Sequence, residues 1–532
     1  MRSKTSWAGA GRAMLAAIAA ISLAAGSAAA QTPKRGGNLQ FAVTAEPADY
    51  DCHASQTFAL LHPVSPFYSF LVRYDASQGG KVTGDLAKSW EMSKDGLTFT
   101  FKLHEGVKFH DGSALTSADV KFSFERIQNP PDGVVSLRKS LFEDVISIDA
   151  PDAATVVFKL KEPNASMMDN FAQPFNCIYS KAKVEKDPRF PIANVVGSGA
   201  FQLVEHVRGS HMTAERFDGY FIKERPYLDG YKAYFVKSGG VVPGMLGGQF
   251  DAEFRGRTPA ERDQLLKGDA NKWTLHEGPW SAVDIIIFNT PKKPFDDVRV
   301  RRALSLAIDR WTGNEQLSKI TLVKETGGFL RPGYELALPK EQMEKIPGYG
   351  RDIEAARTEA RRLLKEAGAE NLKIRLHNRN LDQPYTPAGI FVIDQWRRIG
   401  VNVEHSQVET KAYFGNLVSG DFDVALYPVT TAADNATESH QSHLTNQKSP
   451  ISYARHSDTK LDELWDKQTR ELDPVKRKAL IHEFETRVLT EAYSLSLHWW
   501  KRIIVHHKKI KGWNFSSSHF QGNDLVNVWL DE

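Results

Sequence analysis

Residues 85–120 read DLAKSWEMSKDGLTFTFKLHEGVKFHDGSALTSADV. From Leu97 to Leu103 apolar and polar residues alternate with a period of two, and the preceding Asp95-Gly96 step is typical of a hairpin turn. From Ser117 to Ile127 apolar side chains recur at helical spacing, and we predict that Ser117 caps this helix. The stretch therefore predicts a hairpin strand followed by a helix.

Strand-like and helix-like segments alternate along the rest of the chain. Thr155 to Leu160 repeats the strand pattern, and 496–529 is again strand-like and aromatic. Late helices between 461 and 489 are interrupted at Asp473-Pro474. Between these lie further predicted helices and strands: helices over 297–310, 352–367 and 389–399, and strands over 373–376, 401–403 and 422–426. This alternation predicts an α/β protein with a strand-rich first half and an α/β second half.

The composition is that of an ordinary folded protein of several domains. The chain has 532 residues, of which 41% are apolar and 25% are charged. These fractions exclude a disordered chain and a collagen-like repeat. With 2 cysteines, the chain cannot build a disulfide framework or an array of zinc fingers. The length predicts two to four domains.

The first 30 residues have the layout of a secretory signal. Arg2, Lys4 and Arg12 precede an apolar run from Ala13 to Ala25, and small residues up to Ala30 offer a cleavage site. The run is too short to span a bilayer, and no cysteine follows it that could carry a lipid. We therefore expect an exported, periplasmic protein that is cleaved near Ala30 and is not lipid-anchored.

Export has consequences for charge and for the two cysteines. Without the three basic residues of the signal, 65 basic residues balance 65 acidic ones, so nothing in the charge favours a nucleic-acid partner. In an oxidising compartment Cys52 and Cys177 either form a disulfide or remain as two buried thiols, and the sequence supports both alternatives.

We find no catalytic or cofactor signature in the sequence. There is no GxSxG elbow, no P-loop, and no GxGxxG after a strand, so we predict that the protein is not an enzyme and holds no cofactor. The loop from Asp434 to His443 concentrates carboxylates and imidazoles, which suit a transition metal. Its spacing matches no known metal cage, and a solvated loop is the simpler interpretation, so we predict no metal site.

Trp499 and Trp500 are consecutive residues of a strand-like segment. Their rings should therefore point to opposite faces of a sheet. One ring is then expected in a core and the other beside a cleft, although packing in apolar surroundings remains the simpler interpretation of either ring alone.

The stretch 85–120 resembles the signature of the family 5 extracellular solute-binding proteins. Further matches follow in the order that the family has, and together they extend the resemblance over essentially all of residues 36–532: Gly197 to Leu203, Phe288 to Thr290, Pro294 to Ala303, Ala307 to Arg310, Ala356 to Gly368 and Gly420 to Asp423.

The resemblance implies a bilobal periplasmic-binding-protein fold (type II, cluster C-like) with an extra subdomain inserted in the first lobe. Carried over to this chain, the first lobe comprises 31–74, 196–288 and 498–532. The inserted subdomain comprises 75–195, and the second lobe comprises 289–497. Residues 1–30 form the signal peptide.

The resemblance also implies a role in transport. Such proteins serve bacterial ABC importers: a solute docks in an open cleft, hinge rotation buries it, and the closed lobes present it to a membrane permease. The expected cargo is a small peptide or a related organic solute, and the expected protein is a monomer. The alternative is the same carrier role for a metal chelate, haem, an opine or an oligosaccharide. An enzyme or receptor built on the same fold is a third, weaker hypothesis.

Several positions match family segments that line the cleft. Gln56, Thr57 and Phe58 match a first-lobe segment, and Trp499 matches an aromatic position beside the hinge. In the second lobe, Arg379 is placed to hold a carboxylate, and Thr410 stands where peptide binders often carry an aromatic residue.

Near the end of a second-lobe strand the chain departs from the peptide binders. These hold the amino terminus of their ligand with an acidic residue soon after a tryptophan. Here Val429 or Thr430 replaces the tryptophan, and Asp434 follows about two residues late. Asp434 remains a candidate partner for an ammonium group, and Thr430 a candidate contact.

Overall fold

A computed structural model describes residue 1, residues 32–134 and residues 136–532. Residues 2–31 lie outside the described residues, and with them nearly all of the predicted signal segment. Within the described part of the chain, no helix combines the length and the apolarity needed to cross a bilayer.

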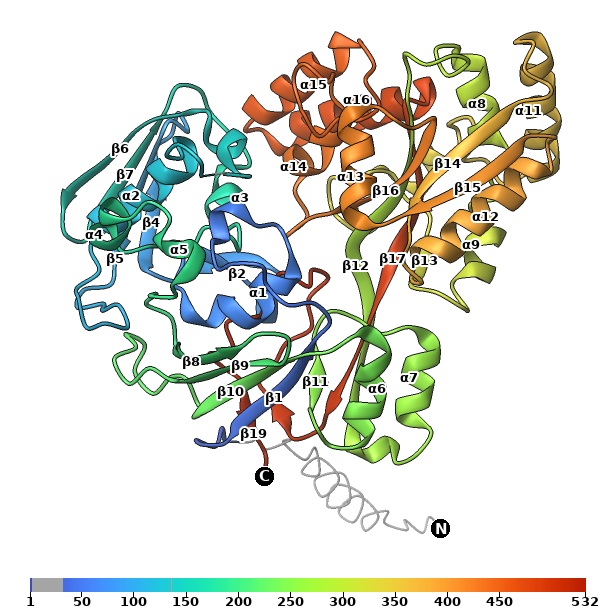
Figure 1. The fold of residues 1–532 in the computed structure, drawn as a ribbon. Coiled ribbons are helices and arrows are strands. Elements are labelled where there is room, and N and C mark those ends of the chain that lie inside the picture. Colours follow the sequence, from blue (N-terminus) through green and yellow to red (C-terminus); the bar gives the residue numbers. More distant parts are fainter. Residues whose placement is uncertain (2–31, 135) are drawn as a thin grey trace.

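One sheet of 11 strands runs through both predicted lobes (Figure 1). From the second lobe to the first, its order is β15 (Asn402–Val408), β14 (Lys373–Arg379), β16 (Val424–Thr430), β12 (Trp273–Phe288), β17 (Ser494–His507), β11 (Ala252–Glu253), β1 (Asn38–Val43), β10 (Gly230–Phe235), β9 (His211–Arg216) and β8 (Phe201–Val207), with β13 (Val323–Glu325) also paired to β17.

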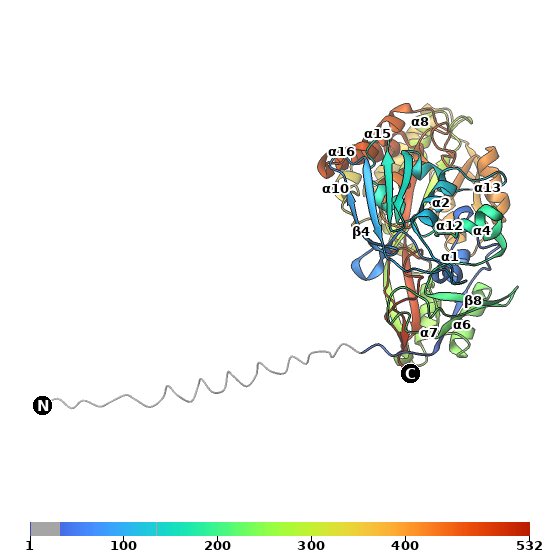
Figure 2. The same ribbon diagram turned by 90° about the vertical axis from the view of Figure 1, so that its left-hand side faces the viewer.

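Two long antiparallel strands, β12 and β17, carry the chain from one lobe to the other, and Figure 2 shows β17 running lengthwise through the molecule. Residues 273–279 of β12 pair with 501–507 of β17, and residues 283–287 pair with 494–499. The register shifts between Pro279 and Val283, at the crossing point. Such an irregularity unpairs residues locally and lets a sheet bend.

The two faces of the sheet bury two separate cores in the second lobe. Because side chains alternate along a strand, Ile286 and Phe288 of β12 enter one core, whereas Ile285 and Ile287 enter the other. Helices α8 (Val298–Leu306), α11 (Ile353–Glu366) and α12 (Tyr385–Arg397) pack into the first core; α13 (Thr410–Ser419), α15 (Thr459–Arg470) and α16 (Pro474–Glu491) pack into the second.

The inserted subdomain has its own four-stranded antiparallel sheet, with a core of interlocking phenylalanines that includes Phe101, Phe124 and Phe158. The order of its strands is β4 (Ala87–Met92), β5 (Thr98–Leu103), β7 (Thr155–Leu160) and β6 (Val145–Asp152), covered by α2 (Ser117–Gln128). The strand predicted at 97–103 is confirmed. The predicted cap is wrong by one residue: Thr116, not Ser117, caps α2, because it forms a reciprocal capping box with Asp119.

Shorter elements complete the fold. They are α1 (Phe58–Val64), α3 (Met167–Phe171), α4 (Lys181–Lys186), α5 (Phe190–Ala193), α6 (Ser238–Leu246), α7 (Pro259–Leu266), α9 (Thr312–Leu317), α10 (Lys340–Met343), α14 (Ala436–His440), and two strand pairs, β2 (Val72–Asp75) with β3 (Lys81–Gly84) and β18 (Ile510–Lys511) with β19 (Trp529–Leu530).

The helix predicted over 297–310 is shorter than expected. Asp297 caps its start, and α8 ends at Leu306. Arg310 turns inward instead of extending the helix, and its guanidinium donates to the carbonyl oxygens of Ser305 at 2.8 Å and Gly348 at 2.6 Å. The arginine thereby satisfies a carbonyl group that the helix end leaves free. The break predicted at Asp473-Pro474 is confirmed, because Asp473 caps α16.

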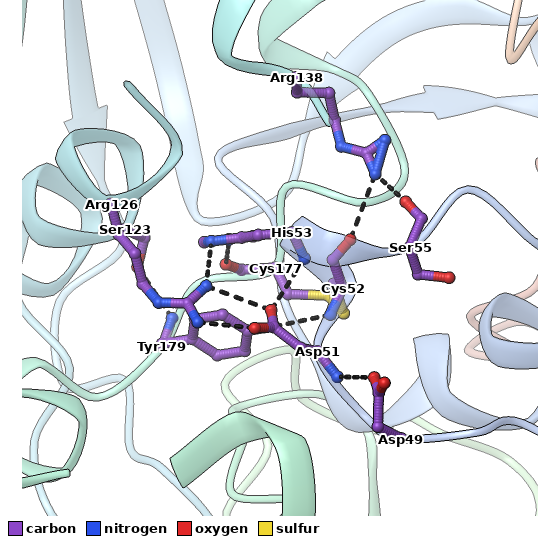
Figure 3. The surroundings of a disulfide bond; sticks show 10 residues. All are labelled: Asp49, Asp51, Cys52, His53, Ser55, Ser123, Arg126, Arg138, Cys177 and Tyr179. Atoms are coloured by element: carbon purple, nitrogen blue, oxygen red, sulfur yellow. Dashed lines mark hydrogen bonds and ion pairs between the residues drawn. A yellow bond between two sulfur atoms is a disulfide. The ribbon is translucent and has the colours of Figure 1, made fainter. Parts of the chain in front are cut away.

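Cys52 and Cys177 form a disulfide, which decides between the two alternatives that the sequence left open (Figure 3). The bond joins Cys52, in the predicted first lobe, to Cys177, in the segment predicted to form the inserted subdomain, across 125 residues of sequence. Beside it, Arg126 of α2 forms a buried ion pair with Asp51 at 2.6 Å. These contacts fix the inserted subdomain to the first lobe.

Candidate functional site

The predicted site residues of the first lobe lie at the start of α1, on the side of this lobe that meets the second lobe. Thr57 caps the helix, because its hydroxyl accepts a hydrogen bond from the backbone N–H of Ala59 at 3.2 Å. Gln56 and Thr57 are exposed, whereas Phe58 is half-buried. The Phe58 ring lies 4.6 Å from the guanidinium of Arg255. The predicted first-lobe segment is therefore accessible, and its aromatic ring packs against a cation.

The second-lobe side is built where β14 ends and α13 begins. Arg379 is the last residue of β14, and its Nη2 donates to the hydroxyl of Thr410 at 3.0 Å. Its Nη1 donates to the hydroxyl oxygen of Tyr385 at 2.7 Å. The structure thus brings together two of the predicted site residues, Arg379 and Thr410, and adds Tyr385, which the sequence did not indicate.

Aromatic rings connect the two sides at the crossing point of β12 and β17. Trp280 packs edge-on against Trp500 at 5.3 Å, and Trp500 packs edge-on against Tyr385 at 5.9 Å. All three side chains are buried. The indole N–H of Trp280 donates to His519 Nδ1 at 2.8 Å, but the indole N–H of Trp500 has no partner among the described residues.

Trp499 lies on the opposite face of the sheet from Trp500, as the strand prediction requires. It packs in the second core of the second lobe, and its indole N–H donates to the carbonyl oxygen of Gly328 at 3.0 Å. Trp500, rather than Trp499, is therefore the tryptophan that lies beside Tyr385. A contact between Trp499 and a bound solute stays a prediction.

At the end of β16 the structure separates the two remaining candidates. Thr430 is the last residue of the strand, pairs with Ala282 of β12 and is half-buried. Asp434 lies four residues further on in a two-pronged ion pair: its carboxylate accepts from Arg331 Nε at 2.9 Å and from Nη2 at 2.5 Å. The carboxylate predicted as an ammonium ligand is already engaged by a cation.

The inserted subdomain contacts the second lobe through polar side chains. Gln173 donates to Glu438 Oε2 at 3.0 Å, and Arg470 pairs with Asp144 at 2.5 Å. Burial raises the pKa of Glu438 to about 7, although the hydrogen bond from Gln173 lowers it. Burial likewise raises the pKa of Asp169, on α3, to about 6. Two carboxyl groups with raised pKa values therefore lie at this contact.

In the loop from Asp434 to His443, which suggested a metal site, the histidine side chains contact other protein side chains. His440 lies 3.4 Å from Glu485, and His443 lies 2.7 Å from the Ser494 hydroxyl. In the part of the chain that the structure describes, no group of three or more histidine, cysteine, aspartate or glutamate side chains is arranged to hold a metal ion.

A separate cavity of about 500 Å³ lies within the second lobe. It opens between α9 and the segment 324–343, where Trp311, Tyr334 and Lys340 line it. None of the predicted site residues lines this cavity.

Comparison with known proteins assigns the chain to a family. Residues 81–450 match the model of the bacterial extracellular solute-binding proteins, family 5. The chain belongs to this family. The resemblance predicted from 85–120 is thereby confirmed, and so is the expectation that the chain is not an enzyme, since the family consists of solute-binding proteins.

Curated relatives include glutathione-binding proteins named GsiB. The protein from Pectobacterium atrosepticum is 32% identical over 326 residues, which cover 61% of this chain and 59% of the relative. The protein from Escherichia coli strain K12 is 30% identical over 329 residues, which cover 62% of this chain and 60% of the relative. The matched part thus spans about three fifths of the length of these relatives.

Solved structures confirm the fold. DppA of Helicobacter pylori in complex with the peptide STSA superposes with a TM-score of 0.80 at 21% identity, covering 94% of this chain and 99% of that one. AgaA of A. tumefaciens R10 in complex with agropinic acid superposes with a TM-score of 0.78 at 24% identity, covering 93% and 99%. The predicted bilobal periplasmic-binding-protein fold is confirmed by these matches.

Proposed function

We propose that this family 5 protein is the periplasmic solute-binding component of an ABC importer. It captures a small peptide or a related organic solute by closure of its lobes and delivers it to the transmembrane subunits of a permease. The signal segment is cleaved near Ala30, no lipid is attached, and the mature protein acts as a monomer with the lobe boundaries given above.

The observation that best supports this proposal is the path of β12 and β17. Both strands continue from one lobe into the other, and their pairing is interrupted between Pro279 and Val283. A bend at this irregularity changes the angle between the lobes without breaking either core. Because Phe58 and Arg255 come from the first lobe and Arg379 and Tyr385 from the second, closure brings side chains of both onto one solute.

The relatives guide the choice of cargo. The GsiB proteins are named for glutathione, a small peptide, which makes glutathione the first solute to test. The structural likenesses to DppA and AgaA lie below 25% identity, so they support the fold and not a cargo. The proposed contacts are Gln56, Thr57, Phe58, Arg379, Thr410, Thr430, Asp434 and Trp499.

The test is thermal unfolding of the purified mature protein with a panel of solutes. A solute that binds only the native state raises the melting temperature by mass action. We expect glutathione or a short peptide to raise it, and a metal chelate, haem, an opine or an oligosaccharide to leave it unchanged. A shift with one of the latter alone supports the alternative cargo. No shift with any solute, together with no solute retained in native mass spectrometry of protein from its own host, contradicts the carrier role.

A further inference from the structure

Apart from the crossing strands, side chains also connect the second lobe to the subdomain built on the four-stranded sheet. Arg470, the last residue of α15, reaches this subdomain from the second lobe (Figure 1). Its Nη1 and Nη2 donate to the two carboxylate oxygens of Asp144, at 2.5 Å and 3.0 Å, and its Nε lies 2.7 Å from Glu162 Oε2. One guanidinium group therefore pairs with two carboxylates across this contact.

A second arginine makes a similar contact from the neighbouring helix. Arg477 lies near the start of α16, and its Nη2 donates to the hydroxyl of Ser166 at 2.7 Å. Its Nη1 donates to the carbonyl oxygen of Ala165 at 3.3 Å, and the backbone N–H of Ala165 donates to the carbonyl oxygen of Thr469 at 2.8 Å. We call the two arginines and the residues that they contact here the latch: Arg470, Arg477, Asp144, Glu162, Ala165 and Ser166.

The two sides of the latch are anchored in different bodies. Helices α15 and α16 are held in the second lobe by its second core, which buries Leu464 and Phe484. The four-stranded subdomain is held to the first lobe by the disulfide between Cys52 and Cys177. A bend at the crossing of β12 and β17 moves the second lobe relative to both of the others. The same bend would therefore part the latch contacts.

The chemistry of the latch suits a contact that forms and breaks repeatedly. The side chain of Asp144 is 9% exposed, so its pair with Arg470 is largely shielded from water while the lobes are together. Two charge-assisted hydrogen bonds in this setting have a fixed geometry and are stronger than neutral ones. When the lobes part, water can take the place of each polar partner. Interfaces between domains that move are accordingly more polar than cores.

We propose that the latch stabilises the closed form of the protein without touching the solute. This inference rests on the proposed carrier function and adds a regulation of its affinity. Because the latch contacts exist only in the closed form, they act together with the solute contacts in shifting the equilibrium toward closure. The latch also delays release, since its contacts must break before the lobes part and the solute leaves.

The experiment measures solute binding and release by stopped-flow tryptophan fluorescence. The probe is glutathione or, if the protein does not bind glutathione, the solute that the protein retains when it is purified from its host. Arg470→Gln should weaken binding roughly 3- to 30-fold, mainly through a faster dissociation rate. Arg398→Gln removes the same charge from an exposed pair at the end of α12, and this control should bind as the wild type does.

A double-mutant cycle separates the latch from a general loss of stability. Asp144→Asn should weaken binding by a similar factor, and adding it to Arg470→Gln should change little, because both substitutions remove the same contact. A purely structural role would lower the melting temperature and leave the dissociation rate unchanged. If Arg470→Gln does not fold, Ser166→Ala takes its place. This variant removes only the hydroxyl that Arg477 contacts and should speed dissociation about 2- to 5-fold.

The outcomes distinguish the latch from the carrier role. The latch is wrong, and the carrier role stands, if the latch variants release the solute at the wild-type rate. The same holds if their loss of affinity comes only from slower association, or if the two substitutions act additively in the cycle. If neither glutathione nor a solute from the host binds the wild type, the carrier role fails, and the latch fails with it.

Discussion

Asp434 and Arg331 form an ion pair in which the side chains are 19% and 18% exposed. The two guanidinium nitrogens that contact the carboxylate give the pair a fixed geometry. The pairing indicates that Asp434 contributes to the stability of the second lobe when no solute is bound.

Asp434→Asn should therefore lower the free energy of unfolding of the protein even when no solute is present. We expect a loss of about 1–2 kcal/mol in the free energy of unfolding, because Arg331 is left partly buried without its counterion. Denaturant unfolding and titration with the best-binding solute measure the two effects. Asp394→Asn, which removes an exposed pair with Arg398, is the control and should change neither. Lost binding with unchanged stability would contradict the stabilising role and support the prediction that Asp434 binds an ammonium group.

Glu438 makes stability depend on pH. Burial raises its pKa from 4.5 to about 7, and Gln173 and Arg138 oppose this while Asp169 adds to it. Burial also raises the pKa of Asp169, to about 6; Arg477 and Tyr74 lower this pKa, and Asp434 adds to the rise. Because the folded protein favours the protonated carboxyl, the stability that this group contributes is fully present below pH 4.5 and is lost as the pH rises through 7.

Glu438→Gln should remove part of this pH dependence. We expect the variant to gain about 1–2 kcal/mol over the wild type at pH 8 and to match it at about pH 4.5. Thermal unfolding at both pH values gives the comparison, and Glu91→Gln on the exposed side of β4 is the control. A variant that is less stable at pH 8 would show that the ionised carboxylate is stabilising in place.

At the scale of single residues, the sequence indicated Arg379 and Thr410 as two separate candidates, and the structure places them in contact. They lie together because β14 ends, and α13 begins, at the same edge of the sheet. The surroundings of Arg255 could not be predicted, because its two aromatic neighbours, Phe58 and Trp280, lie more than 200 residues apart in the sequence. The tryptophan pair could be divided between two faces by strand geometry, but which ring faces the junction required the register of β17.

Among the elements, β12 shows how pairing overrides local signals. Gly278 and Pro279 lie in the middle of this 16-residue strand, and proline normally argues against a strand interior. The strand continues because β17 pairs with it on both sides of the irregularity that begins at Pro279. Short segments such as 155–160 were predictable because their own alternation specifies them. The family resemblance implied two lobes, and the pairing of β12 with β17 shows how the chain crosses between them.

The disulfide between Cys52 and Cys177 adds a covalent cross-link between elements of the predicted first lobe and the predicted inserted subdomain. Because it closes a long loop, removing it should cost about 2–4 kcal/mol. We expect both a reducing agent and the double variant Cys52→Ala, Cys177→Ala to lower the melting temperature by similar amounts. The reducing agent should not affect the double variant. A wild type that melts identically with and without reductant would show that the link contributes nothing to stability.

On the scale of the whole molecule, a single sheet continues from one lobe into the other. The strand order places the second-lobe strands on one side of β12 and β17 and the first-lobe strands on the other. Bending at the crossing therefore moves two intact bodies, each with its own core. The alternation of strands and helices predicted an α/β class, but not this continuity, because strand order depends on contacts between residues distant in sequence.

Closure around a solute is tested most directly by small-angle X-ray scattering on three samples. These are the mature protein as purified from its host, the same protein stripped of solute by unfolding and refolding, and the stripped protein with its solute returned. We predict that stripping increases the radius of gyration and that returning the solute restores the smaller value. Identical scattering from all three samples, with solute binding verified in the third, would contradict the account.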